Sequence, residues 1–331
     1  MEVRFCGLED AACVIDFIRK EWNSEHVFIY SRELFDYQHL DKKNGRYNFV
    51  IGVDDGGAIQ AVLGFIPPGH FSDHADGIVW LSLWKTAKTC TDKALGLKLL
   101  AFLEKSVPNS GVRTSGISLQ AKLIYKALRF NIVQLAHYYI KITPDETVIA
   151  EGLRAFEVFP ESPQVGLREG TGPALSEFSG MAGRLRNSAY FQNKYLNHPI
   201  YKYQVVHAES GNLTLVYRLV EGPGGLVMRI VDFSGDPKAL PTVVDALIAL
   251  GKKSQVEYID ILCYWSDDSA ILESGFNKVK EEIVPNYFEP FVKKNVLIES
   301  AIKGNASEEV VFIMKGDGDQ DRPSRVEKVI A

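Results

Sequence analysis

Small residues open a predicted helix after the loop that follows an apolar strand, in a pattern suited to binding a phosphate. Ala94 and Gly96 stand in the first helical turn of this segment. Small residues let the backbone close around a pyrophosphate, and the N–H groups of a first helical turn, reinforced by the helix dipole, bind negative charge. The alternative is an ordinary helix start with one glycine. We therefore expect a phosphate-binding loop that includes Thr91, Lys93, Ala94, Leu95 and Gly96.

Histidine is the side chain whose ordinary pKa, about 6.5, suits a general base near neutral pH. Of the seven histidines, His26 follows a predicted amphipathic helix and His137 lies in the predicted strand Ile132–Ile142. Each is a candidate base; the alternative for each is a hydrogen-bonded structural residue. His74 lies in a loop at a strand edge, where we expect contact with a substrate.

Charged and aromatic residues near the C-terminus form a second group of candidates. Asp317, Asp319 and Asp321 alternate as in the start of a calcium loop. Arg322 stands where that loop needs Gly and Lys328 where it needs Glu, which excludes calcium. This loop is either a solvated turn or the wall of a cleft, in which the Asp residues hold an amine or hydroxyls and Arg322 holds a phosphate. Tyr287 is a candidate for stacking a nucleotide base, with core packing as the alternative.

Composition bounds the class of protein. The 331 residues favour two domains, and 46% apolar with 24% charged residues is typical of a soluble globular protein. The net charge of −5, with no long basic run, argues against a nucleic-acid partner. No stretch approaches the roughly 18 apolar residues of a membrane span, and Met1–Asp10 lacks a signal-peptide pattern, so we expect a cytoplasmic protein. The four cysteines have no metal-ligand or disulfide spacing.

The elements that must position these residues follow a mixed α/β pattern. Helices are predicted over Ala11–Trp22, Asp92–Lys105, Ala121–Leu128, Leu240–Gly251 and Ser269–Ser274. Strands are predicted over Tyr47–Val53, Ala58–Ile66, Ile78–Trp84, Gly116–Leu119, Leu213–Val220, Leu226–Phe233, Tyr258–Tyr264 and Val310–Met314. The order hairpin, strand, helix, strand, short helix, strand occurs in both halves. We therefore expect two similar domains, 1–155 and 184–331, joined by a connector over 156–183 that is rich in Pro, Gly, Ser and Glu.

Three features of the first half resemble the acyl-CoA-dependent N-acyltransferase (GNAT) superfamily. The strand Trp80–Lys85 follows a hairpin strand that ends in Gly64-Phe65; Ala94-x-Gly96 falls on the small positions of the family's Gln/Arg-x-x-Gly-x-Gly/Ala signature; and Ala121–Phe130 is similar to Ala-x-x-Leu-Tyr-x-x-Leu-Gly-Phe. The resemblance implies an α/β (α+β) fold of two tandem domains, each a mixed, mostly antiparallel sheet flanked by helices. It also implies backbone donors to the thioester near Leu83, Trp84 and Lys85, and a Tyr125 hydroxyl that protonates the departing thiolate.

The second half lacks the phosphate-binding pattern. Asp236 is acidic, and Pro237 and Pro241 each remove an N–H donor, so this loop should not hold a pyrophosphate. We expect acyl-CoA to bind the N-terminal domain, while the C-terminal domain has an acceptor-binding and structural role.

Two further segments, Tyr190–Pro199 and Lys315–Pro323, resemble tandem acyltransferases of bacterial surface-polysaccharide pathways. This resemblance implies transfer of an acyl group, acetyl in the first instance, from acetyl-CoA to the amine of a nucleotide-linked amino sugar, without a metal. The alternatives are a transferase that uses aminoacyl-tRNA for peptidoglycan-type precursors and a catalytically inactive module that binds CoA or another ligand.

Overall fold

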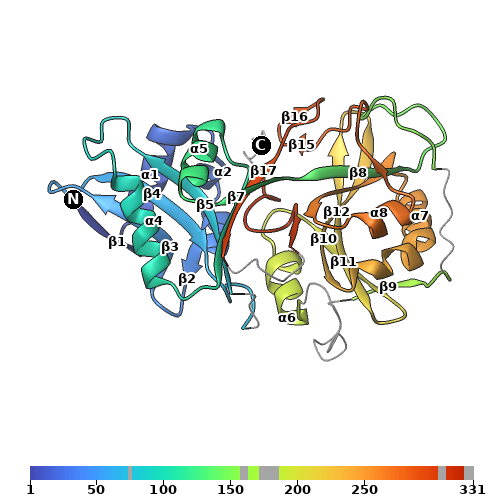
Figure 1. Ribbon diagram of the computed structural model, residues 1–331, viewed down its shortest axis with the longest axis horizontal. Coiled ribbons are helices and arrows are strands. Elements are labelled where there is room, and N and C mark those ends of the chain that lie inside the picture. Colours follow the sequence, from blue (N-terminus) through green and yellow to red (C-terminus); the bar gives the residue numbers. More distant parts are fainter. Residues whose placement is uncertain (74–76, 157–162, 171–185, 305–310, 324–331) are drawn as a thin grey trace. The chain divides into compact units, whose positions relative to one another are not determined.

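The computed structural model describes residues 1–73, 77–156, 163–170, 186–304 and 311–323; His74 lies outside these residues. The chain forms two compact units (Figure 1). The first consists of Met1–Ile132 with the later segments Ser300–Asn305 and Gly318–Ala331, and the second of Val133–Glu299 with Ala306–Asp317. Residues 133–155, expected in the first domain, thus group with the second unit, and two C-terminal segments group with the first.

The first unit is built on an eight-stranded sheet in the order β1-β3-β4-β5-β6-β17-β7, with β2 beside β3 (Figure 1). Its strands are β1 (Glu2–Gly7), β2 (Leu40–Asp41), β3 (Arg46–Val53), β4 (Ile59–Ile66), β5 (Ile78–Thr86), β6 (Gly111–Ser115), β7 (Asn131–Gln134) and β17 (Glu299–Gly304). Its helices are α1 (Ala11–Phe17), which continues as a π-helical turn over Ile18–Trp22, α2 (Val27–Tyr30), α3 (Arg32–His39), α4 (Leu95–Ser106) and α5 (Leu119–Ala127).

Helices cover both faces of this sheet. A Cβ added to Gly52 of β3 would meet the Leu95 side chain of α4 at 2.9 Å. Phe49, three residues earlier on the same strand, instead packs on Phe35 and His39 of α3. Because side chains alternate between the faces of a strand, α4 and α3 lie on opposite faces. Apolar residues from both layers form one core. The apolar periodicity predicts β3 and α4, whereas it does not predict α3.

The second unit is built on a sheet in the order β14-β8-β13-β12-β11-β10-β9, with β18 beside β13, and on a small hairpin. Its strands are β8 (Ala136–Lys141), β9 (Leu167–Glu169), β10 (Tyr203–Ala208), β11 (Leu213–Gly222), β12 (Gly225–Gly235), β13 (Tyr258–Trp265), β14 (Asn277–Lys278), β15 (Tyr287–Phe288), β16 (Phe291–Val292) and β18 (Phe312–Met314). Its helical elements are α6 (Ser188–Phe191), the π-helical turn η3 (Gln192–Leu196), the 3-10 helix η4 (Pro237–Val243), α7 (Val244–Lys253) and α8 (Ser269–Glu273). Both units thus have mixed, mostly antiparallel sheets with flanking helices, as expected.

The strand predicted at Gly116–Leu119 is wrong. The strand at this point of the chain is β6, five residues earlier, and Ser118 caps α5 by accepting the N–H of Ala121 at 3.2 Å. The polar side chains of Arg113, Thr114 and Ser115 hide the strand because apolar alternation is the signal by which a buried strand is recognised.

Candidate active site

In the first unit, the parallel strands β5 and β6 separate part-way along their length. Their pairing ends at Leu81 and Thr114, although β5 continues to Thr86. On its other edge β5 stays paired with β4 through this region, across an irregular register beside Gly64. The C-terminal half of β5 therefore has one edge that β6 does not cover.

Backbone donors face this uncovered edge. The N–H of Ala87 donates to β4 at 2.8 Å, so the alternation of an antiparallel pair turns the N–H groups of Trp84 and Thr86 away from β4 and toward the gap. Lys85 has the opposite direction, toward β4, and the Leu83 side chain lies in the core at 1% exposure. Of the three residues expected to donate to a thioester, Trp84 has the suitable backbone orientation.

The first turn of α4 also presents free donors. Among the described residues no acceptor bonds the backbone N–H of Gly96 or Leu97. A Cβ on Gly96 would lie 3.2 Å from Nε1 of Trp84, so this turn packs closely on β5 where the gap opens. Leu95 is fully buried and anchors the helix in the core. Two N–H groups at a helix start can bind an anion.

One carboxylate opposes that use. Oδ1 of Asp92 accepts the N–H of Ala94 at 3.0 Å, and Oδ2 lies 2.7 Å from Nζ of Lys98. The contact with Lys98 and the N–H of Ala94 hold the pKa of Asp92 below its ordinary value, so the group is charged. Lys93 donates to a loop carbonyl, and Thr91 is exposed. The predicted loop therefore offers two free N–H groups with one negative charge beside them, which Lys98 partly neutralises.

The Tyr125 hydroxyl lies where β5 and β6 separate. It makes a hydrogen bond with Thr114, the last residue of β6 that pairs with β5. Its ring contacts Trp84 and Phe130, with centroids 5.5 Å and 4.9 Å apart. Burial raises the pKa of Tyr125, so the hydroxyl keeps its proton at neutral pH. It has the protonation state that a general acid requires.

His26 lies in the first unit but does not have the form of a base. Its Nδ1 accepts the N–H of Phe28 at 3.3 Å and caps α2, so in the neutral ring the proton is on Nε2. Burial and the nearby charge of Arg322 lower the pKa of His26 to about 3. The lone pair that would accept a proton is in use, and we correct His26 from a general base to a neutral donor.

The segment 318–323 brings two other predicted site residues, Asp319 and Arg322, to the side of the first unit where α2 lies. The Arg322 guanidinium lies over the Phe28 ring, 5.2 Å from its centroid, and its Nε donates to Asp319 at 3.2 Å. Nε2 of Gln320 donates to the carbonyl of Ser115, at the end of β6, at 2.8 Å. His26, Asp319 and Arg322, which are far apart in the sequence, are thus brought together.

In the second unit the corresponding gap is closed. Strands β12 and β13 pair only from Val227 to Ile230 on β12, which continues to Gly235. Beyond that point β18 pairs with β13, and since β8 occupies the other edge of β13, β18 lies on the edge that β12 has left. Gly316 then donates to the Val231 carbonyl of β12 at 2.8 Å. Backbone thus fills a space in which, among the described residues of the first unit, no strand pairs with the C-terminal half of β5.

A buried polar cluster lies beside this closure. The hydroxyls of Tyr190 and Tyr195 both donate to Oδ2 of Asp232, at 3.3 and 2.5 Å, and Nζ of Lys194 donates to Tyr190 at 2.9 Å. A Cβ on Gly316 would lie 2.5 Å from the Tyr195 hydroxyl, so the segments Tyr190–Pro199 and Lys315–Pro323 meet here. The sequence singled out both segments without indicating that they touch.

Two further predicted residues lie in the second unit. Asp317 is 1% exposed, accepts the N–H of Met314 at 2.9 Å and lies 3.7 Å from the Arg186 guanidinium. The Tyr287 ring lies 5.0 Å from Nζ of Lys315. Asp317 and Tyr287 therefore both contact other residues of the second unit, and these contacts help to stabilise that unit.

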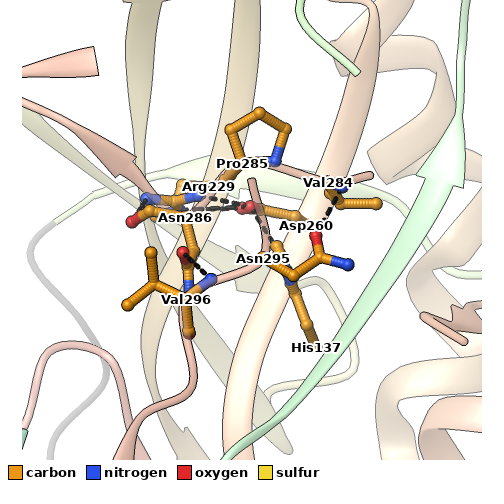
Figure 2. A network of polar contacts seen from close by, with 8 residues as sticks. All are labelled: His137, Arg229, Asp260, Val284, Pro285, Asn286, Asn295 and Val296. Carbon is orange, nitrogen blue, oxygen red and sulfur yellow. Dashed lines mark hydrogen bonds and ion pairs between the residues drawn. The ribbon is translucent and has the colours of Figure 1, made fainter. Parts of the chain in front are cut away.

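His137 belongs to a buried ionic network in the second unit (Figure 2). Its Nε2 lies 2.9 Å from Oδ2 of Asp260, whose carboxylate also receives Nε and Nη2 of Arg229 at 3.0 and 2.6 Å. Arg229 donates in addition to the carbonyls of Pro285 and Asn286, each at 3.2 Å. The charges of Asp260 and Arg229 are paired with each other, and His137 is bonded to the same carboxylate. We therefore correct His137 from a general base to a structural residue that connects β8 to β13.

Sequence reasoning missed several residues of the first unit. Thr114 and Gln320 bond groups at the edge of the gap, and the Ser82 hydroxyl of β5 is buried without a hydrogen-bond partner. The only available signal was their polarity within or beside a strand, which did not distinguish them from surface residues.

The solved structures that this chain resembles include GCN5-related N-acetyltransferases. A GCN5-related N-acetyltransferase from Anabaena variabilis matches 90% of this chain and 72% of its own at 12% identity, with a TM-score of 0.52. One from Kribbella flavida matches 91% and 70% at 10% identity and TM-score 0.52, and a conserved protein from Enterococcus faecalis matches 90% and 71% at 10% identity and TM-score 0.54. At such identities the likeness establishes the fold, two tandem GNAT-like domains.

No protein-family model and no curated protein matches the sequence. In the part of the chain that the structure describes, no helix is long and apolar enough to cross a membrane, and no group of three His, Cys, Asp or Glu side chains is placed to hold a metal ion.

Proposed function

We propose that the protein is an N-acyltransferase that moves an acyl group from CoA to an amine, with the donor bound in the first unit. The observation that carries the proposal is the gap between β5 and β6, with the protonated Tyr125 hydroxyl at the point where Leu81 and Thr114 end the pairing. The fold it shares with solved N-acetyltransferases supports the same reaction.

Different residues around the gap can carry out the separate steps of acyl transfer. The N–H of Trp84 would polarise the thioester carbonyl, and those of Gly96 and Leu97 would hold the pyrophosphate. The amine nitrogen attacks the carbonyl carbon, the C–N bond forms and the C–S bond breaks. Tyr125 donates its proton to the departing thiolate, and the proton lost from the amine passes to water, from which Tyr125 is reprotonated.

No histidine base is needed in this scheme. Amines with pKa values near those of an α-amine, about 7.7–8.0, are partly neutral at physiological pH and enter as nucleophiles. We propose acetyl-CoA as the donor and, as the acceptor class, an amino sugar carried on a nucleotide. The charged residues Asp319 and Arg322 on the α2 side of the first unit support a polar, anionic acceptor.

Acetyl-CoA binding and turnover test the proposal. At about 100 times its Kd, acetyl-CoA should add roughly 2.7 kcal/mol to the stability of the full chain. Gly96→Val should reduce this stabilisation, because a larger side chain meets Trp84 and Thr86; Gly56→Val, in the β3–β4 hairpin turn, is the matched control. Release of free CoA with an added amine then separates an enzyme from an inactive binder. Absence of both stabilisation and turnover would reject the function.

A further inference from the structure

We propose that His26 and Arg322 form an oxyanion subsite of the first unit, which takes a carboxylate or phosphate group carried by the acceptor. The inference rests on the proposed function only in assigning the anion to the acceptor. It rests on two side chains that pack against the Phe28 ring. Each has one N–H donor, Nε2 of His26 and Nη2 of Arg322, for which the described residues provide no acceptor.

Arg322 is held so that one end of its guanidinium is unused. Nε donates to Asp319 at 3.2 Å, Nη1 donates to the Pro323 carbonyl at 3.3 Å, and Cζ lies over the Phe28 ring. Among the described residues nothing accepts from Nη2. The side chain is 17% exposed. A guanidinium with two positions fixed is pre-organised to offer its remaining N–H groups to an oxygen anion.

His26 supplies the second donor. Its ring lies 4.8 Å from the same Phe28 ring, and because Nδ1 accepts the N–H of Phe28, Nε2 carries the proton. No described residue accepts from Nε2, although the side chain is only 4% exposed. Nε2 itself is not enclosed by the protein, so its N–H is open to a bound oxygen, which can accept from it. Burial and Arg322 keep the ring neutral, so its donor role does not change with pH near neutrality.

The segment that carries Arg322 is fixed in place. Gln320 bonds the end of β6, and Gly318, at φ +57°, packs against Trp80: a Cβ there would lie 3.1 Å from the ring. Asp319 balances the charge of Arg322, so recognition depends on directed hydrogen bonds rather than on net charge. Carboxylate and phosphate both offer oxygens suited to such a pair.

Thermal unfolding of the full chain with inorganic phosphate or acetate, at constant ionic strength, tests the subsite without requiring turnover. We compare the native protein with Arg322→Met. The control is Arg19→Met, because Arg19 also pairs with an Asp three residues away in the same unit. The native protein and the control should be stabilised by the anion at concentrations about tenfold lower than Arg322→Met requires. The anion with the larger difference identifies the source, phosphate or carboxylate.

Equal responses of all three proteins would overturn the subsite. If Arg322→Met does not fold, Arg322→Lys keeps the charge but lacks the forked donors, and a response of this variant equal to that of the native protein would also overturn it. The catalytic arm compares glucosamine with glucosamine 6-phosphate: the native protein should prefer the phosphorylated amine, and Arg322→Met should lose the preference through KM rather than kcat. Anion binding without any acyl transfer would retain the subsite and reject the proposed function.

Discussion

The two units contain the same local arrangement with opposite outcomes. In each, two parallel strands pair for four residues and then separate, β5 from β6 and β12 from β13. In the first unit the exposed edge of β5 faces a helix start with two free N–H groups. In the second unit β18 and Gly316 cover the edge, and Asp236 and two prolines occupy the loop that follows. Among the described residues, the shared fold thus leaves this edge of β5 without a strand partner in the first unit and fills the corresponding space with chain in the second.

The polar groups beside the two strand separations differ in how many hydrogen-bond partners they have. Tyr125 in the first unit has one hydroxyl partner at the gap, whereas Asp232 in the second is bonded by two tyrosines and the Phe233 N–H. A group with several partners is held in one state, which suits a structural role. A group at the edge of a gap can exchange its partner for a substrate.

The largest effect is expected from breaking the ionic network of the second unit. Arg229→Met leaves Asp260 buried without its cation, and removing one partner of a buried ion pair costs about 3–5 kcal/mol. Chemical denaturation should measure this loss of unfolding free energy. Arg19→Met, at an exposed ion pair, should change stability by less than about 0.5 kcal/mol. Similar losses in both variants would mean that the network does not hold the second unit together.

The same network predicts a dependence of stability on pH. Burial alone would raise the pKa of Asp260, but Arg229 and His137 outweigh it and hold the pKa at about 2. The unfolded value is about 3.9, so the stabilisation is complete above pH 4 and is lost as the pH falls from about 4 through 2. Denaturation midpoints should fall over this window, and Asp260→Asn, less stable overall, should show a smaller dependence. An unchanged slope in that variant would assign the acid sensitivity to other carboxylates.

Tyr125→Phe tests the open gap of the first unit. The variant keeps the ring against Trp84 and removes the hydroxyl, so kcat should fall about 10²-fold while the melting temperature changes little. Tyr195→Phe is the matched control because it removes the tyrosine hydroxyl on Asp232 in the closed unit. It should lower stability and leave kcat close to native. An unchanged kcat in Tyr125→Phe would make this tyrosine a core residue.

Gly316→Ala tests the closed gap of the second unit. The new Cβ would meet the Tyr195 hydroxyl at 2.5 Å and the Val231 carbonyl at 2.7 Å, and overpacking of this kind costs about 1–3 kcal/mol. Gly56→Ala, whose Cβ would meet only Asp54 at 3.4 Å, should be close to neutral. If both variants unfold at the same denaturant concentration, the segment after β18 is not tightly packed on β12.

The smallest effect is expected at the start of α4. Asp92→Asn removes the carboxylate beside the N–H groups of Gly96 and Leu97, so CoA should bind about twofold to fivefold more tightly. Asp55→Asn, at a fully exposed turn of the same unit, is the control. Titration at low ionic strength measures both, since salt screens this interaction. Weaker binding by Asp92→Asn would mean that the Asp92–Lys98 pair shapes the loop for its ligand.

The apolar pattern of the sequence is sufficient to predict the helices and strands whose buried faces are apolar. Periodicity placed α1, the β3–β4 hairpin, β5, α4 and α5, because their buried faces carry large apolar residues at regular spacing. It also distinguished the two loops, because Ala94 and Gly96 permit free N–H groups whereas Asp236, Pro237 and Pro241 do not. These are local properties of a few adjacent residues, which a sequence displays directly.

The roles of the polar residues, by contrast, follow from contacts that form in the folded chain. That β17 belongs to the first sheet, that β18 closes the second gap, and that Arg322 and His26 both pack against Phe28 all depend on contacts between residues far apart in the chain. His137 was a candidate base because it follows the Tyr125 helix in a strand beside two tyrosines, but Asp260 of β13, which also binds Arg229 of β12, pairs with it. A titratable group takes its role from the partners that surround it in space, and local sequence carries no record of them.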